Sequence, residues 1–191
     1  MSQATEQRPL LSPQASDLCV ACGLCCDGSI YARVSLEPEE IEPAAAEGLE
    51  VFARDDKPFF KLGCPRLDGT ACQIYERRPL RCRSFRCVLL HRLDTGDIQI
   101  DEAVAVATEA RRLADHADAI DDRLESRASA RVRWYRHLPS FAASSPGERA
   151  EPAWLLAMTA FNLFLDRHFR KPHQRLIVEG GTAAPEVAER D

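Results

Sequence analysis

The chain has 191 residues, a formal net charge of −5 at pH 7, a pI near 5.6 and 45% hydrophobic residues. This length allows one domain with a proper core, so disulfide bonds are not needed for stability. The acidic balance disfavours a general nucleic-acid binder, and no segment approaches the roughly 20 apolar residues of a membrane span or resembles a signal peptide. We therefore expect a cytoplasmic protein that makes no membrane contact.

The N-terminal half predicts short elements and many turns. Residues 1–16 are polar and lack periodicity, which predicts a disordered lead-in. Residues 29–36 (SIYARVSL) alternate as a strand does, and residues 37–49 (EPEEIEPAAAEGL) predict a short helix that Pro43 shortens or bends. Two further short strands are predicted in KPFFKLG and ACQIYE, around a turn at Asp68-Gly69.

The second half predicts two long helices. The first has Asp101 as a plausible N-cap and runs to Leu138, before Pro139. Its apolar residues follow steps of four and three: Val106, Ala110, Leu113, Ala117, Ile120 and Leu124. The second helix has a stripe that is typical of core packing: Trp154, Met158, Phe161, Leu165 and Phe169. We expect these helices to form a hairpin that packs on itself or on the cysteine-rich half.

Together these patterns predict an α+β fold in which a small, metal-organised cysteine-rich domain with short strands precedes an α-helical hairpin. The boundaries we expect are a disordered N-terminus at 1–16, a cysteine-cluster domain at 17–95, a helical hairpin at 96–175 and a flexible tail at 176–191.

All eight cysteines lie in the first half of the chain, in two sets of four. The first set is C-x2-C-x2-C-C and the second is C-x7-C-x9-C-x4-C. They are Cys19, Cys22, Cys25 and Cys26, then Cys64, Cys72, Cys82 and Cys87. Because cytoplasmic thiols are kept reduced, cysteines clustered at this spacing are more often metal ligands or redox groups than structural disulfides.

The spacing leaves the identity of the metal open. Cys22-Gly23 is a common feature of zinc knuckles, in which the glycine permits a tight turn. The C-x2-C-x2-C run also resembles the loop that gives a [4Fe-4S] cluster three ligands, and Cys64-Pro65 resembles the remote Cys-Pro that gives the fourth. The cofactor is therefore an iron-sulfur cluster or Zn²⁺.

The adjacent Cys25 and Cys26 indicate more than one site. Neighbouring side chains usually point apart, so both thiolates would bind one mononuclear ion with difficulty. Two four-thiolate sites or one polynuclear cluster would resolve this, each site drawing on both cysteine sets. In the alternative reading, only four or five cysteines are ligands and the others are small buried hydrophobic residues.

Five arginines crowd around the last two cysteines. They are Arg77, Arg78, Arg81, Arg83 and Arg86. Four thiolates around a divalent ion sum to about −2, so nearby guanidinium groups would lower the cost of holding the centre. We expect Arg78 and Arg81 to lie beside the sulfurs, where they hydrogen-bond loop carbonyls or offset thiolate charge. The alternative is that these arginines recognise an anionic partner.

Neither the histidines nor the known catalytic motifs identify a further functional site. His91, four residues after Cys87, is the only histidine placed to join a site, and a surface or core role is the simpler reading. The sequence has no phosphate-binding glycine loop, nucleophile elbow, dinucleotide fingerprint or zinc-protease motif.

The cysteine segments resemble a known family. CVACGLCC at 19–26 and CPRLDGTACQIYERRPLRCRSFRC at 64–87 are similar to the CxxCxxCC domain of YkgJ-type cysteine-cluster proteins, described as zinc- or iron-chelating. The resemblance covers roughly residues 17–90 and implies metal or cluster binding. One relative, the flagellin lysine N-methylase, carries a similar cysteine domain, but this chain shows no recognisable S-adenosylmethionine site.

Three functional hypotheses follow from these observations. The chain is an iron-sulfur protein that passes electrons to a redox partner or senses oxidants, a zinc-stabilised module that binds another protein, or a cluster-dependent protein-modifying enzyme. The tight three-cysteine run with a distant Cys-Pro favours the iron-sulfur protein. The partner protein is unknown.

Overall fold

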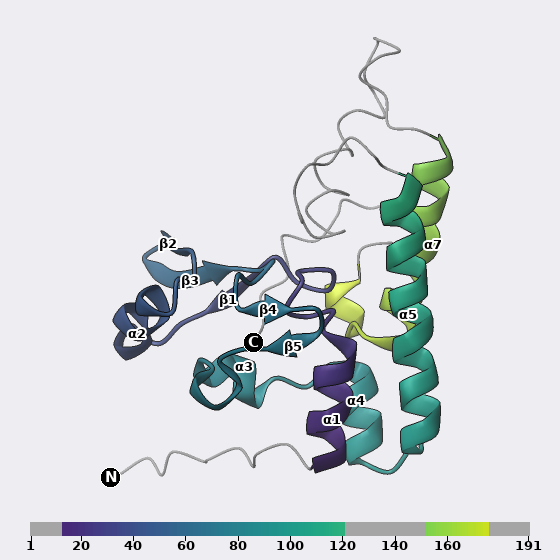
Figure 1. Ribbon diagram of the computed structural model, residues 1–191, viewed down its shortest axis with the longest axis horizontal. Coiled ribbons are helices and arrows are strands. Elements are labelled where there is room, and N and C mark those ends of the chain that lie inside the picture. The colour runs from purple at the N-terminus through teal and green to yellow at the C-terminus, as the bar shows by residue number, and fades with distance from the viewer. Residues whose placement is uncertain (1–12, 121–151, 176–191) are drawn as a thin grey trace.

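The computed structural model describes residues 13–120 and 152–175, and it has an α+β fold. Figure 1 shows small antiparallel sheets on one side and a layer of helices on the other. The predicted fold class is confirmed. The predicted lead-in up to residue 12, the helix beyond residue 120 and the tail from residue 176 lie outside the described residues.

Helix α1 (Pro13–Cys22) carries the first two cysteines. It begins within the last residues of the predicted lead-in, and proline is well suited to a first helical position. Ala15, Leu18 and Cys22 form its buried face, and the helix packs against α4 (Val88–Asp94) and α5 (Ile100–Ile120). The cysteine-rich segment therefore starts on a helix that shares the core, not on a loop as the spacing suggested.

The larger sheet has the strand order β1-β3-β2 and is antiparallel throughout. Its strands are β1 (Arg33–Ser35), β2 (Val51–Arg54) and β3 (Lys57–Lys61). The prediction missed β2, which pairs with β3 through a tight turn. In that turn Asp55 and Asp56 have φ of 51° and 59°, the left-handed conformation that such hairpins need.

The second sheet is a minimal hairpin of β4 (Leu67–Asp68) and β5 (Ala71–Cys72). The turn at Asp68-Gly69 was predicted correctly, but the predicted pairing around it was wrong. KPFFKLG supplies β3, which pairs with β1 and β2, whereas β5 pairs with β4. This pairing brings Cys72 opposite Leu67, three residues after Cys64.

Short helices fill the connections between the strands. The predicted helix at 37–49 is a 3-10 turn (Pro38–Glu40) that continues into α2 (Ile41–Ala46), and Gly48 follows with φ of 75°. A second 3-10 turn (Tyr75–Arg77) leads into α3 (Leu80–Ser84). Cys82 lies in α3, and Cys87 is the N-cap of α4.

The two long helices α5 and α7 (Pro152–His168) pack along each other (Figure 1). Every residue of the predicted apolar stripe from Trp154 to Phe169 is buried. On α5 the buried residues are alanines, which let the helices approach closely: Ala103, Ala107, Ala110, Ala114 and Ala117. Asp101 lies in the first turn of α5, one residue after the helix begins, and is not its N-cap.

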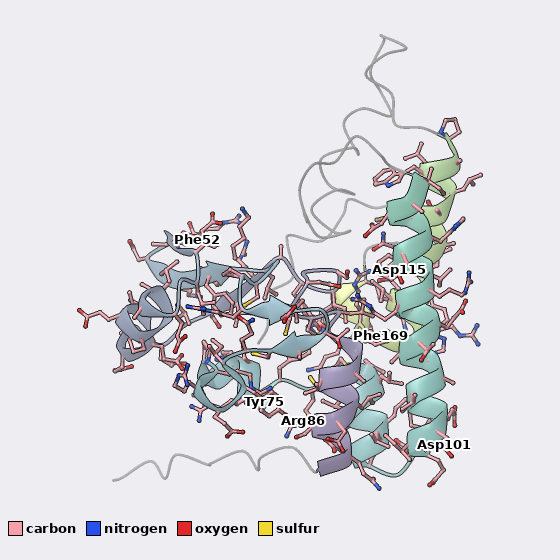
Figure 2. All side chains as sticks on the ribbon, viewed as in Figure 1. Phe52, Tyr75, Arg86, Asp101, Asp115 and Phe169 are labelled. Atoms are coloured by element: carbon pink, nitrogen blue, oxygen red, sulfur yellow. The ribbon has the colours of Figure 1, made fainter. Side chains whose placement is uncertain are left out.

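One hydrophobic core runs through the molecule, from Ala15 in α1 through the strands to Phe169 after α7. In Figure 2 the sulfur atoms gather where the small sheets meet α1, and Phe169 marks the end of α7 close to that junction. The predicted cysteine-rich and helical regions therefore share a single core. A short 3-10 helix (Pro172–Gln174) ends the described chain.

Candidate metal centre

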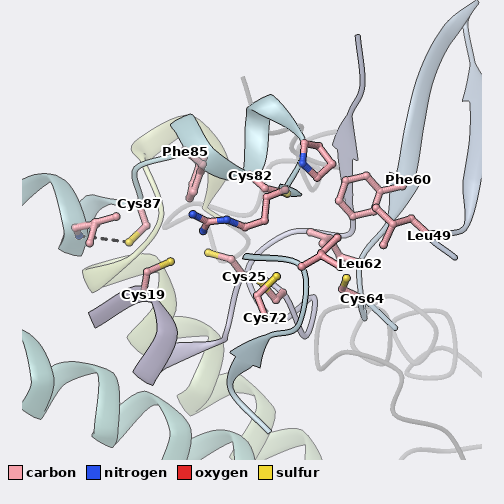
Figure 3. Close-up of a pocket in the computed structure, with 15 residues that line it drawn as sticks. Cys19, Cys25, Leu49, Phe60, Leu62, Cys64, Cys72, Cys82, Phe85 and Cys87 are labelled. Carbon is pink, nitrogen blue, oxygen red and sulfur yellow. Dashed lines mark hydrogen bonds between the residues drawn. The ribbon is translucent and has the colours of Figure 1, made fainter. Parts of the chain in front are cut away.

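All eight cysteines line two adjoining cavities, the larger between the small sheets, α1 and α3, and the smaller between α1, the loop that follows it and α4. The larger cavity is lined by Cys19, Cys25, Cys26, Cys64, Cys72, Cys82 and Cys87 (Figure 3), and the smaller by Cys19, Cys22, Cys25, Cys26 and Cys87. Their volumes are about 50 and 30 Å³. Each exceeds the roughly 10–15 Å³ that one water-sized group requires. The fold thus brings together both cysteine sets, which are separated by about forty residues of sequence.

Helix α1 places the first two thiols one helical turn apart. Cys19 and Cys22 are three residues apart, so they lie on neighbouring positions of one helix face. Gly23 ends the helix with φ of 66°, as the sequence predicted for a tight turn. An added Cβ at Gly23 would meet the Cα of Thr70 at 3.1 Å, so this glycine also permits close packing on the β4–β5 hairpin.

A compact loop then carries the adjacent cysteines. Its backbone hydrogen bonds run from the N–H of Cys26 to the carbonyl oxygen of Gly23 (2.9 Å) and from the N–H of Ile30 to that of Leu24 (3.2 Å). The Cys26 carbonyl oxygen accepts a 2.9 Å hydrogen bond from the N–H of Cys64. The two cysteine sets are therefore joined directly through the main chain.

The charged pair next to this loop ties it to the helical layer. Asp27 follows Cys26 and accepts hydrogen bonds from the backbone N–H of Ser29 (2.8 Å) and from Arg111 of α5 (2.7 Å). Burial raises the pKa of the Asp27 carboxyl, and the hydrogen bonds from Ser29 and Arg111 oppose that rise. The sequence did not predict this contact, because nothing in the local pattern relates residues 84 positions apart.

The walls around the thiols are mostly apolar. The side chains that line the larger cavity beside the cysteines are Leu49, Phe60, Leu62, Ile74, Phe85, Leu90, Pro79 and Arg78. Apolar walls restrict water and lower the local dielectric, which strengthens every interaction with a bound charge. The backbone N–H of Leu90 donates a 3.4 Å hydrogen bond to the sulfur of Cys87, the type of contact that stabilises a thiolate.

Burial governs the chemistry of Cys22. It raises the pKa of the Cys22 thiol far above its ordinary value, and nearby Cys87 and Cys19 add to the effect. A thiol in this environment keeps its proton unless a metal ion displaces it. Cys22 is therefore suited to be a metal ligand and poorly suited to be a free nucleophile.

The structure distinguishes four of the five arginines by their contacts, and the fifth, Arg83, is exposed. Arg78 lines the larger cavity, donates a 2.7 Å hydrogen bond to the carbonyl oxygen of Tyr75 and stacks on the Tyr75 ring. The Nε of Arg81 is buried and has no hydrogen-bond partner. Arg77 and Arg86 make ion pairs with Glu47 and Asp94, at 2.8 and 3.1 Å. His91 is exposed and lines neither cavity.

Within residues 13–120 and 152–175, no three His, Cys, Asp or Glu side chains already surround a common point as a metal site requires. The thiols line the cavities without converging on one position. The donor set nevertheless fits a thiophilic metal, because thiolates are the ligands that zinc and iron-sulfur clusters prefer.

A family model covers half of the chain. It matches residues 18–113 and is described as "Putative zinc- or iron-chelating domain". The chain belongs to the CxxCxxCC family. The family match extends past the expected domain boundary at residue 95 and includes most of α5. No curated protein and no solved structure matches the chain significantly. Among the described helices, none combines the length and apolar character that crossing a bilayer requires.

Proposed function

We propose that the eight cysteines bind metal in two neighbouring groups of four, and that the centre is an iron-sulfur cluster of the [4Fe-4S] type with a redox or oxidant-sensing role. One observation carries this proposal: all eight thiols line two adjoining cavities that have four of them in common. A metal-chelating family, a thiol-only donor set and apolar walls support it.

The grouping starts from the four thiols that line only one cavity, and the four that line both are divided between the groups by their neighbours. Cys22 lines only the smaller cavity, and the pKa of its thiol responds to Cys19 and Cys87. Cys64, Cys72 and Cys82 line only the larger one. Figure 3 shows Cys19 and Cys87 at one end of the cavity and Cys64 at the other, with Cys25 and Cys72 between them. The proposed groups are Cys19, Cys22, Cys25 and Cys87, and Cys26, Cys64, Cys72 and Cys82.

The continuous core favours a functional centre over a purely structural one. Structural zinc typically stabilises domains that are too small for a sufficient core. Here the cysteine-bearing segments pack into a core that also contains α5 and α7. The chain therefore has other sources of stability, which leaves the thiols available for a centre with chemistry of its own.

An iron-sulfur cluster would supply one-electron transfer. The residues of this chain would set its environment. The apolar side chains around Phe60 and Leu62 would limit water, the Leu90 N–H would hydrogen-bond the Cys87 sulfur, and Arg78 would offset negative charge. These are the groups through which a protein adjusts the potential of a cluster.

Zinc is the second candidate, since eight thiols in two groups of four also match two tetrahedral four-thiolate sites. Such a protein would be a zinc-stabilised interaction module. The hypothesis of a cluster-dependent modifying enzyme stays a prediction without an identified substrate pocket.

Anaerobic purification of the full chain followed by analysis of iron, zinc and acid-labile sulfide separates these candidates. The proposal predicts a brown protein that contains iron and sulfide in similar amounts. A colourless protein with two zinc ions would favour the interaction module. A protein that retains no metal and binds none on reconstitution would contradict both candidates.

A further inference from the structure

Residues 162–174 lie in the second half of α7 and directly after it. They contact the loop that carries Cys25 and Cys26, and they contact the start of α4 next to Cys87. We propose that Arg170 is a positioning residue for the metal centre: its buried guanidinium group holds the loop that carries Cys25 and Cys26. This inference rests on the proposed function, and it extends that function to residues 162–174, which lie beyond the matched residues 18–113.

Arg170 follows α7 and is only 1% exposed. Its guanidinium group donates to the carboxylate of Asp166 at 2.8 Å and to the amide oxygen of Asn162 at 3.1 Å. A third hydrogen bond, of 3.0 Å, goes to the backbone carbonyl oxygen of Ser29. Asp166 and Asn162 fix the guanidinium on α7, and its Nη2 both donates a 3.2 Å hydrogen bond to Asn162 and makes the bond to Ser29.

The position of Ser29 restrains the positions of Cys25 and Cys26. It is three residues after Cys26, and the loop between them is closed by a 3.3 Å hydrogen bond from the N–H of Gly28 to the carbonyl oxygen of Cys25. Because the loop is this short, a shift of Ser29 moves Cys25 and Cys26 with it. The bond from Arg170 therefore restrains where these two thiols can lie.

A second contact from the same segment restrains Cys87. The carbonyl oxygen of Phe169 accepts a 3.1 Å hydrogen bond from the N–H of Val88, the residue directly after Cys87. Phe169 also lines the smaller cavity. The same carbonyl thus fixes the start of α4, where Leu90 hydrogen-bonds the Cys87 sulfur.

A third contact passes through two aromatic rings. The hydroxyl of Tyr31 donates a 3.0 Å hydrogen bond to the side-chain oxygen of Gln174, and both residues are buried. The Tyr31 ring packs edge-to-face on Phe85, with ring centroids 5.0 Å apart. Phe85 lines the larger cavity and lies between Cys82 and Cys87 in the sequence.

Core packing alone does not explain a buried arginine. A buried ion pair generally adds no more stability than apolar side chains of the same volume, because both charges lose their hydration. Arginine differs from such side chains by donating several hydrogen bonds in fixed directions. One of the hydrogen bonds of Arg170 goes to the backbone carbonyl oxygen of Ser29, in the loop that carries Cys25 and Cys26.

The test compares variants of the full chain by anaerobic titration with Co²⁺, whose thiolate charge-transfer absorption reports sulfur coordination. Arg170→Met removes the hydrogen bonds and keeps an apolar stem. We expect about 10- to 100-fold weaker Co²⁺ binding and an altered absorption spectrum, as for loss of other groups that orient metal ligands. Arg170→Lys keeps a charge near Asp166 but loses the branched donor group, so its affinity should lie between wild type and Arg170→Met.

Met158→Ala is the matched control. Met158 is fully buried on the same helix, and it lines neither thiol cavity. This variant should melt at a lower temperature while its Co²⁺ affinity and spectrum match wild type. Tyr31→Phe is a milder second variant, because it removes only the hydroxyl contact to Gln174 and should still change the spectrum.

The outcomes separate the two proposals. If wild type retains no metal after anaerobic purification and shows no thiolate–cobalt absorption, the proposed metal-binding function is wrong. If wild type binds Co²⁺ and Arg170→Met matches Met158→Ala in affinity and spectrum, the positioning role is wrong. Should Arg170→Met fail to fold, the same comparison is made with Arg170→Lys and Tyr31→Phe, and wild-type spectra from both would overturn the inference.

Discussion

The backbone N–H of Cys64 donates a 2.9 Å hydrogen bond to the carbonyl oxygen of Cys26. This bond joins the two cysteine sets at the main chain, and it aligns Cys26 with the residues that line the larger cavity. Cys25, the preceding residue, lies in Figure 3 toward Cys19 and Cys87. Both thiols line both cavities, and the proposed grouping assigns Cys25 to the group of Cys22 and Cys26 to the group of Cys64.

The proposed grouping predicts that Cys25→Ser and Cys26→Ser lose different parts of the bound metal. Cys25→Ser should reduce the occupancy of the group with Cys22, and Cys26→Ser that of the group with Cys64. Each variant is the matched control for the other, because both change one sulfur to oxygen in the same loop. Metal analysis and spectroscopy of the two proteins make the measurement. A structure with both sulfurs on one mononuclear ion would contradict the assignment.

Gly23→Ala should destabilise the protein more than Gly69→Ala does. Both glycines have positive φ, 66° and 58°, so alanine costs roughly 1–2 kcal/mol at either position. Only at Gly23 would the new Cβ meet backbone, at 3.1 Å from the Cα of Thr70; at Gly69 it meets nothing within 4 Å. Urea unfolding of both variants gives the difference. Equal losses would show that the contact with Thr70 is unimportant.

Removal of metal should loosen the cysteine-bearing half and spare the long helices. The strands are short, and β4 and β5 have two residues each, so bound metal would add local stability there to what the shared core supplies. Helices α5 and α7 have their own packing surface. Near- and far-ultraviolet circular dichroism with and without chelator tests this expectation. Unchanged near-ultraviolet signal and unchanged melting after verified metal loss would be evidence against it.

The sequence predicted the features that depend on local chemistry. The turn at Gly23, the strand around Val34 and the buried stripe from Trp154 to Phe169 follow from glycine conformation and from apolar periodicity. The cysteine spacing led us to expect metal sites that draw on both sets. Each cavity contains cysteines from both, and metal binding by these thiols stays a prediction.

Features that depend on distant contacts were not predictable. Helix α1 begins in a mostly polar stretch of sequence, and its helical form relies on burial of Ala15 and Leu18 against α4 and α5. The pairing of β5 with β4 instead of β3 likewise depends on tertiary contacts, which the local sequence does not show. Arg170 looks like an ordinary charged residue after a helix, and only the fold shows that it contacts Ser29 across 141 residues.

Stability of the metal-free protein should fall as pH rises above about 8.5, the ordinary pKa of a thiol. The pKa of Cys22 is raised in the folded state, so its thiol stays protonated there while the unfolded chain ionises. The unfolded state then binds fewer protons, and unfolding becomes easier by up to about 1.4 kcal/mol per pH unit. Anaerobic urea unfolding at pH 7.5 and 9.5 measures this change.

The control for this pH effect is Cys22→Ala. It removes the titrating group, so its stability should depend less on pH than that of wild type over the same interval. An identical pH dependence in both proteins would mean that Cys22 is not the group responsible. In the metal-loaded protein the trend should reverse, because ligand thiols bind metal more tightly as protons are removed.

The last prediction concerns Arg78 and Arg81, compared with their neighbour Arg77. Arg78 lines the larger cavity and fixes the carbonyl of Tyr75, and Arg81 has a buried Nε beside the ligand candidate Cys82. Arg78→Gln and Arg81→Gln should therefore weaken metal binding about 10- to 100-fold or shift the potential of a cluster. Arg77 is exposed and pairs with Glu47, so Arg77→Gln should leave the metal site unchanged. Chelator competition and redox titration of the three variants measure these effects.

One outcome would contradict charge compensation: Arg78→Gln and Arg81→Gln keep full metal affinity and an unshifted potential, yet lose binding to an anionic partner. These arginines would then belong to a recognition surface.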